Sequence, residues 1–340
     1  ITEDDKPFTV KDMGVGGSIV ALLLDALKPN LVQTTEGTPA FVHCGPFANI
    51  AHGCNSVMAT AAALEYGDYA ITEAGFGVDL GGRRIIKKKS RKTGLQPDLT
   101  VLVVTLQALK MHGGVAQEDI KKPNIAGMEA GYWNLDKHVK NLQSFGQTVV
   151  IAFNKFATDT DEEIEVLRKH CEEMGCGFAV NSAFAEGGNG AIELANLVVK
   201  TIDERPSAPL YFACDDNDTV EEKIEKVAFN LYGAGSVTLS DSAKAMIEEI
   251  KKLGAEKFPI CIAKTQYSFS TDAKAYGPTD GFELHVRDIT VNMGAEMIVV
   301  IAGPIMRMPG LPKSPQAERI DVVKGEITGL SYTLQISKIL

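Results

Sequence analysis

The chain has 340 residues, of which 45% are apolar and 23% are charged, as in an ordinary globular protein with a sizeable core. This length exceeds the size at which one hydrophobic core usually stops growing, so two or more domains are expected. The formal net charge of −10 argues against general nucleic-acid binding, because such proteins carry a basic face that neutralises phosphates.

Cysteine usage and hydropathy indicate the compartment. The six cysteines form no CxxC pair and no regular framework, which favours reduced thiols over disulfides or a zinc site. No apolar stretch approaches the ~20 residues that span a bilayer. The first residues, ITEDDKPFTV, are too acidic for a signal peptide. A soluble, cytoplasmic protein without a membrane partner is therefore expected.

Helical periodicity and apolar runs alternate along the first half of the chain. Helices are predicted at 19–27, 55–66, 135–145 and 161–174, the last capped by Thr158 or Asp159. Four runs rich in Val, Ile and Thr, each followed by a glycine-rich or polar loop, are predicted as strands: FVHC (41–44), YAIT (69–72), LTVLVVTL (99–106) and TVVIAF (148–153). They lack polar alternation, as strands of a covered parallel sheet do, so the predicted fold class is α/β, doubly wound.

The loops that follow the four strands predict one shared site. In open α/β sheets, ligands gather outside the carboxyl ends of the strands, where strand-to-helix loops meet. We expect His43, Phe76, Lys110 and Asn154 around one cleft. The candidate polar lining comes from all four loops: His43, Asn49, His52, Glu73, Asp79, Lys110, His112, Asn154 and Lys155.

Each of these signals has an alternative. His43 and His52 lack the spacing of HExxH, so structural or substrate-binding roles are favoured over metal ligation, and no metal-ligating residue is predicted. His43 beside Cys44 is a weak candidate nucleophilic pair, because sequence neighbours seldom supply that geometry. The glycines of GFGVDLGG serve either close ligand approach or tight turns. NKFATD (154–159) is similar to the NKxD loop of P-loop GTPases, with its aspartate displaced.

Eight segments carry a more specific likeness in one order along the chain: FVHCGPFANIAHG, TEAGFGVDLG, QALKMHGG, NKFATDT, FAEGGNG, FPICIAKTQYS, VRDI and MPGLPK with QAERID. In order and approximate spacing they resemble the formate–tetrahydrofolate ligase family, also called 10-formyltetrahydrofolate synthetases. The likeness runs from about residue 4 to about residue 330.

The resemblance implies an ATP-dependent reaction with Mg²⁺, in which formate attacks the γ-phosphate and tetrahydrofolate takes the formyl group from formyl phosphate. It implies catalytic roles for Lys110, His112 and His43. Glycines and aromatic or polar side chains around the rings and phosphates are implied as binding residues: Phe76, Gly75, Gly77, Asn154, Lys155, Phe258, Pro259 and Phe282. Phe76 and Phe47 are candidate walls for one ring, and the alternative for each of these phenylalanines is packing in the core. The family also forms homo-oligomers.

Three departures from the family pattern qualify this expectation. The family carries a P-loop of the type GxxxxGK[ST], which these residues lack, so a P-loop NTPase sheet incomplete at its N-terminus is expected. The stretch GGRRIIKKKSRK (81–92) is either a solvated basic loop or a contact for a phosphate or polyglutamate tail. Gln107 stands where the family usually has arginine, and the last ten residues leave the pattern.

The domain prediction follows the likeness and the linkers. Residues 1–205 are assigned to the remaining nucleotide-binding α/β domain, which ends at the linker DERPSAP (203–209). Residues 206–257 form a helical segment and 258–340 a strand-rich C-terminal domain. Two alternatives to an active ligase stay open. One is an inactive fragment or folate-binding subunit that needs a P-loop-bearing partner, and the other is a GTPase-like switch.

Overall fold

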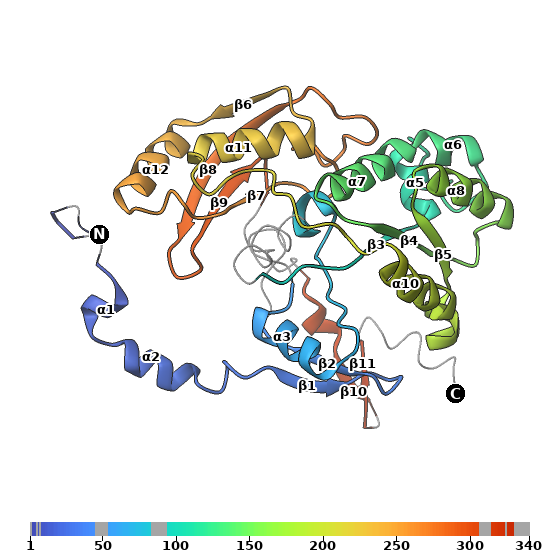
Figure 1. The fold of residues 1–340 in the computed structure, drawn as a ribbon, viewed down its shortest axis with the longest axis horizontal. Helices are drawn as coiled ribbons and strands as arrows, with labels where there is room; N and C mark the ends of the chain where they lie inside the picture. The colour runs from blue at the N-terminus through green and yellow to red at the C-terminus, as the bar shows by residue number, and fades with distance from the viewer. Residues whose placement is uncertain are drawn as a thin grey trace. The chain divides into compact units, whose positions relative to one another are not determined.

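The structure is a computed structural model that describes residues 2–4, 6, 8–44, 54–82, 94–305, 314–323 and 325–329. The chain divides into two compact units, residues 1–305 and 306–340. Among the described residues, the first unit contains a two-stranded hairpin and two larger sheets with helices packed on them, and the second contains a small hairpin (Figure 1).

The N-terminal segment forms short helices and a hairpin. Its elements are α1 (Val10–Met13), α2 (Gly16–Leu23), β1 (Asn30–Gln33), β2 (Pro39–Val42) and α3 (Val57–Tyr66). Thr9 and Asp12 form a capping box at the start of α1. The strand predicted at 41–44 forms as β2, but its predicted place in the parallel sheet is wrong, since β2 pairs antiparallel with β1 across the turn around Gly37, where φ is +83°. Residues 39–42 pair with the nearby strand β1 because an antiparallel hairpin needs only a short turn between its two strands.

Three parallel strands form the first sheet, in the order β3-β4-β5. They are β3 (Thr100–Val104), β4 (Val149–Asn154) and β5 (Gly177–Asn181), so the predicted strands at 99–106 and 148–153 are confirmed. The five residues of β4 from Val149 to Phe153 are buried, as its apolar run predicts for a central strand. Among the described residues no strand forms at 69–72, where the predicted strand is therefore wrong.

Helices cover this sheet because each has one apolar stripe. Leu135, Val139 and Leu142 recur at helical spacing on α7 and are buried. The helices of this part are α5 (Leu106–His112), α6 (Ile125–Ala130), α7 (Tyr132–Ser144), α8 (Asp161–Glu173), α9 (Ala183–Glu186) and α10 (Ile192–Glu204), with turns η1 (Val78–Gly82) and η3 (Gly187–Ala191). The cap of α8 is Thr160, whose hydroxyl accepts from the Glu163 N–H, not Thr158 or Asp159.

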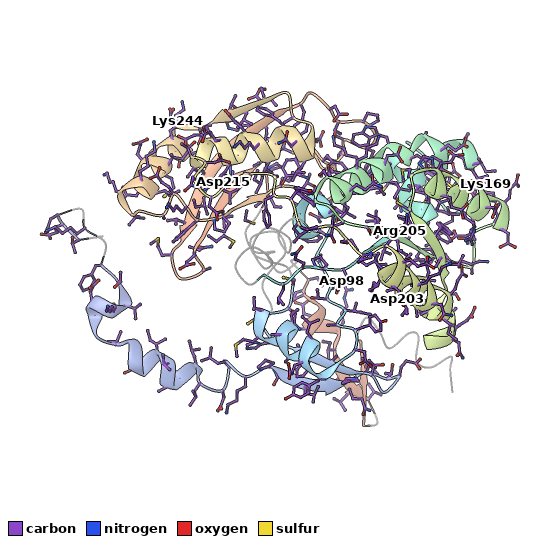
Figure 2. The ribbon with its side chains drawn as sticks, viewed as in Figure 1. Asp98, Lys169, Asp203, Arg205, Asp215 and Lys244 are labelled. Carbon is purple, nitrogen blue, oxygen red and sulfur yellow. The ribbon has the colours of Figure 1, made fainter. Side chains whose placement is uncertain are left out.

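The proline-bearing linker after α10 is held to the first sheet. Asp203 and Arg205 lie at the end of α10, and Asp98 lies just before β3 (Figure 2). The Ser207 N–H donates to the Asp98 carbonyl at 2.8 Å. The Ala208 N–H donates to the Gly146 carbonyl at 2.9 Å. The predicted linker is thus an ordered connection between the two sheets.

The second sheet has four strands in the order β6-β8-β9-β7. They are β6 (Ser236–Leu239), β7 (Ile260–Ala263), β8 (Glu283–Asn292) and β9 (Met297–Ala302), joined by α11 (Val220–Val227), the π-helical turn η4 (Ala228–Tyr232) and α12 (Asp241–Lys252). Strand β8 runs antiparallel to β9, whereas β7 is parallel to β9 and β6 to β8. Alternate residues of β7 and β9 enter two cores, with Ile260 and Ile262 against the helices.

The domain boundaries at 205 and 257 stay predictions. Helices α11 and α12 share one core with strands β7 to β9, so segments 206–257 and 258–305 are built around the same apolar centre. The second unit contains the turn η5 (Gln316–Arg319) and an antiparallel hairpin of β10 (Asp321–Val323) and β11 (Glu326–Thr328). No helix in the described ranges is long and apolar enough to cross a membrane.

Candidate functional site

The lysine of QALKMHGG lies in a buried ion pair. Lys110 Nζ is 2.6 Å from Glu163 Oε1, and each side chain is 1% exposed. The ammonium also donates to the Lys122 carbonyl at 2.8 Å. Burial alone would raise the pKa of Glu163, but hydrogen bonds from Lys110, Asn124 and Thr160 outweigh it and lower the pKa below its usual value. The pair thus ties α5 to α8.

A second buried pair joins the turn η1 to the segment that follows β7. Lys264, directly after β7, is fully buried, and its Nζ lies 2.7 Å from Asp79 Oδ2 on η1. It also donates to the Ser268 carbonyl at 2.6 Å and lies 4.9 Å from the centre of the Tyr232 ring. Burial would raise the pKa of Asp79, but the Lys264 ammonium outweighs it, so the pKa is lowered and the carboxylate stays charged.

A small polar cavity adjoins this pair. Its volume is about 30 Å³, room for about two water molecules. The polar side chains in its wall come from both halves of the first unit: Asp79, His112, Asn134, His138, Gln266, Tyr267 and Ser268. Among the described residues, His138 Nδ1 is buried with no hydrogen-bond partner. A ligand group or water that enters this cavity therefore meets two imidazoles and two amides.

Burial keeps both histidines of the cavity neutral. It lowers the pKa of His138 to about 4 and lowers that of His112 in the same direction. His112 also packs edge-on against Tyr276, with ring centres 5.9 Å apart. At neutral pH each ring can therefore donate through one nitrogen and accept through the other.

Acid should destabilise the fold through His138. Its folded pKa lies below its unfolded value, so the unfolded state binds more protons and the free energy of unfolding falls as the pH drops from about 6.5 to about 4. Urea unfolding at pH 7, 5.5 and 4.5 measures this slope. The variant His138→Gln should have a shallower slope, and an equal slope would contradict the assignment.

The GFG turn lies beside the Asp79 pair. Phe76 has φ of +63°, a left-handed conformation that is costly for a residue with a Cβ, and its side chain is 51% exposed. A Cβ on Gly77 would lie 2.7 Å from Asp79 Oδ1 and 2.9 Å from His138 Cε1. Only glycine fits there. Gly77 thus lies against Asp79 and His138, two residues of the cavity wall, and the expectation that Phe76 shares a cleft with the other loops stays a prediction.

Asn154 and Lys155 lie at the carboxyl edge of the first sheet. The Asn154 side-chain carbonyl accepts from Asn181 Nδ2 at 2.7 Å, and the Lys155 N–H donates to the Asn181 carbonyl at 3.0 Å. Lys155 Nζ reaches Asp161 at 3.1 Å. The aspartate of NKFATD instead accepts from the Phe156 N–H within its own turn at 2.8 Å. That local role weakens the comparison with a GTPase base-reading loop.

His43 has local partners on both ring nitrogens. Nδ1 lies 2.8 Å from Ser56 Oγ and Nε2 lies 2.8 Å from the Ala26 carbonyl. The hydrogen bonds of His43, Lys110 and Asn154 thus lead to different neighbours, so the expectation that they share one cleft with Phe76 stays a prediction. Phe47, Asn49, His52 and most of the basic run 81–92 lie outside the described residues.

The predicted folate residues lie on the second sheet. Phe258 and Pro259 precede β7, whereas Lys264 follows it, so a strand of about 13 Å separates them from the Asp79 pair. Phe282 precedes β8, at the edge where the antiparallel β7 ends. Phe258 and Phe282 are both partly buried against the core. A ring contact for either phenylalanine therefore stays a prediction.

The described residues contain no group of three or more His, Cys, Asp or Glu side chains able to hold a metal ion. Asp79, a carboxylate of the predicted polar lining, is already paired with Lys264 at 2.7 Å. The protein side chains described thus do not fit a dedicated magnesium site. Magnesium bound with a nucleotide would take phosphate and water oxygens as its main ligands.

Sequence reasoning missed Lys264, His138 and Glu163 as members of these clusters. The sequence did contain a signal for Lys264, because this lysine directly follows the apolar run of FPICIAK. That position predicts a lysine that is buried or lies at the end of a strand. His138 and Glu163 lie on predicted helices, where periodicity predicts burial but not the partner.

The comparisons with known proteins agree over nearly the whole chain. The family model for formate–tetrahydrofolate ligase matches residues 1–331. Formate–tetrahydrofolate ligases of Bacteroides fragilis and Bacteroides thetaiotaomicron are 64% and 62% identical over 330 residues, covering 97% of this chain. That of Campylobacter curvus is 49% identical over 329 residues, covering 96%. The chain spans 60% of the length of each of these relatives. It belongs to the formate–tetrahydrofolate ligase family.

Proposed function

We propose that the chain takes part in the ATP-dependent joining of formate to tetrahydrofolate, giving 10-formyltetrahydrofolate through formyl phosphate. The observation that carries the proposal is the family match over residues 1–331, together with relatives named for this reaction at up to 64% identity. The proposal includes MgATP as the phosphoryl donor and a cytoplasmic homo-oligomer as the working form.

The geometry supports different roles for the three residues proposed as catalytic. The Lys110 ammonium is 1% exposed and bound to Glu163, which favours orienting the QALKMHGG turn over direct phosphate contact. Both ring nitrogens of His43 are hydrogen-bonded to neighbouring groups. This likewise favours a role in orienting its own loop over direct contact with a reacting group. His112 is only partly buried and lies in the cavity wall. It is the best placed of the three to hydrogen-bond a reacting group.

The binding residues divide between the sheets. Asn154 and Lys155, at the carboxyl edge of the first sheet, are proposed for the nucleotide, because ligands gather at such edges. Phe258, Pro259 and Phe282 are proposed for the folate, and Phe76 with Gly75 and Gly77 for one of the two ring systems. Formyl phosphate formation needs cations and N–H groups around the phosphoryl oxygens.

A second candidate function is a folate-binding or inactive subunit that depends on a P-loop-bearing partner. The 340 residues contain no GxxxxGK[ST] motif. Strand β3 is an edge of the described sheet, and its Val101 and Val103 are 39% and 57% exposed. An edge of this kind supports pairing with further strands of a P-loop NTPase sheet, because parallel strands are normally covered on both faces.

The isolated chain should therefore form no detectable 10-formyltetrahydrofolate from formate, MgATP and tetrahydrofolate. Losing a single preorganised donor for transition-state charge can cost ~10²–10³ in rate, and a whole phosphate cradle costs more. Product formation is assayed with the chain alone and with the part of the Bacteroides fragilis relative that the chain does not cover. Restored turnover supports the ligase. Folate binding without any turnover in either mixture favours the binding subunit, and turnover by the chain alone shows that the cradle is dispensable.

A further inference from the structure

The turn that carries Phe76 is anchored far more strongly than a surface turn requires. The three residues that follow Gly77 are all buried, with Val78 and Asp79 5% exposed and Leu80 1% exposed. Phe76 itself is 51% exposed in a left-handed conformation. Strained residues of this kind persist only where the surrounding structure over-determines them, and they cluster at ligand sites.

The polar part of the anchor converges on the turn from three segments. Asp79 on η1 pairs with Lys264 after β7, and its backbone carbonyl accepts from the Tyr232 hydroxyl at 3.4 Å. His138 on α7 packs against Phe269 with ring centres 4.6 Å apart. A Cβ on Gly77 would meet both Asp79 and His138. The ion pair and the imidazole therefore lie directly behind the turn that presents the Phe76 ring.

We propose that Asp79, Lys264 and His138 are positioning residues that hold Phe76 as an exposed stacking platform for the planar heteroaromatic ring of a substrate. The inference rests on the proposed function, which supplies two such rings, the adenine of ATP and the pterin of tetrahydrofolate. An exposed, conformationally fixed aromatic ring loses little freedom when a second ring stacks on it. The pair acts through the turn that carries Phe76.

Stability alone does not require a buried ion pair, which gives a sharp test. Removing one partner leaves a buried charge and strongly destabilises a fold, whereas replacing both by uncharged residues of similar size is often neutral. The single variants Lys264→Met and Asp79→Asn should thus melt well below the wild type. The double variant D79N/K264M should regain most of the melting temperature. If the pair only stabilised the fold, the double variant would also have the wild-type cleavage rate after Phe76 and the wild-type ligand affinities.

The rate of chymotryptic cleavage after Phe76 measures how often the turn opens locally. In the double variant we expect this cleavage to be about tenfold faster than in the wild type, because the turn opens locally more often. Cleavage after Tyr211, which is 63% exposed, is the internal control and should not change. Mass spectrometry identifies both sites. Wild-type cleavage rates after Phe76 in a double variant of restored stability would overturn the positioning role.

Calorimetric titration identifies the ring. MgATP and tetrahydrofolate are titrated separately into the wild-type chain, Phe76→Gly and the double variant. We expect Phe76→Gly and the double variant to weaken the same ligand, each by about five- to tenfold, as expected for one lost stacking contact. The ligand whose affinity falls then shows whether the adenine or the pterin ring stacks on Phe76. If both ligands bind all three proteins equally, the platform is wrong while the proposed function stands. If neither ligand binds the wild type, the platform is contradicted, whereas the proposed function is decided separately by turnover in the mixture with the remaining part of the relative.

Discussion

Replacing Lys110 by methionine should lower the free energy of unfolding by about 3–5 kcal/mol, the cost of leaving one buried charge without its partner. Glu163, 1% exposed, would keep its charge in an apolar surrounding or take up a proton. Three helices meet at this pair, since Lys110 lies on α5, Glu163 lies on α8, and the Asn124 N–H before α6 also donates to the carboxylate at 2.7 Å. Breaking this pair is therefore expected to destabilise the packing of all three helices.

Equilibrium urea unfolding of Lys110→Met, Glu163→Gln and the double variant measures this effect. The double variant should be clearly more stable than Lys110→Met, because neither charge is then left alone. The exposed pair of Lys122 and Asp119 offers a matched control, and Lys122→Met should leave the unfolding midpoint unchanged. A Lys110→Met midpoint equal to that of the wild type would contradict the buried pair.

Replacing Gly113 by alanine should cost about 3 kcal/mol or more, since the new methyl group meets backbone and not a movable side chain. A Cβ at Gly113 would lie 1.9 Å from the Gly127 carbonyl oxygen, and a Cβ at Gly131 would lie 1.9 Å from the Leu109 carbonyl oxygen. These glycines let α5 approach α6 and α7 at backbone contact. Alanine at either position forces the helices apart.

The neighbouring Gly114 supplies the control for this prediction. It has φ of +84° with nothing within 4 Å of an added Cβ, so Gly114→Ala should cost only the left-handed strain of about 1–2 kcal/mol. Thermal and urea unfolding of both variants separate the two effects. Equal losses at Gly113 and Gly114 would show that helix contact does not set the cost at Gly113.

Local sequence signals predicted the elements well where the apolar pattern and the packing agree. The helices α3, α7 and α8 formed within a few residues of prediction, and β3 and β4 pair in parallel as expected. The strand predicted at 41–44 formed as β2, but outside the parallel sheet, because a strand pattern does not specify its partner and β1 lies nearby in the chain. The run at 69–72 forms no strand, because a run of this length needs a neighbouring strand to pair with and has none in the described sheet.

The candidate site was predictable only as a set of segments. The motifs that carry Phe76, Lys110 and Lys264 were all singled out, because glycines and charges beside apolar strands are visible in sequence. Their pairing was not, since Asp79 lies 185 positions before Lys264 by their residue numbers and only the tertiary fold brings them to 2.7 Å. The same limit hid the partnership of Lys110 with Glu163.

The transfer of oxygen from formate to phosphate tests the central claim most directly. Formate labelled with ¹⁸O is supplied with MgATP and tetrahydrofolate to the chain together with the remaining part of the Bacteroides fragilis relative. If a formate oxygen attacks the γ-phosphorus and N10 of the folate then displaces phosphate from the formyl carbon, the bridging oxygen leaves with the phosphate. We expect ¹⁸O-labelled inorganic phosphate, seen by ³¹P NMR, in equal amount to 10-formyltetrahydrofolate. Product formed with unlabelled phosphate would contradict the formyl phosphate route, and labelled phosphate without the folate product would contradict the ligation.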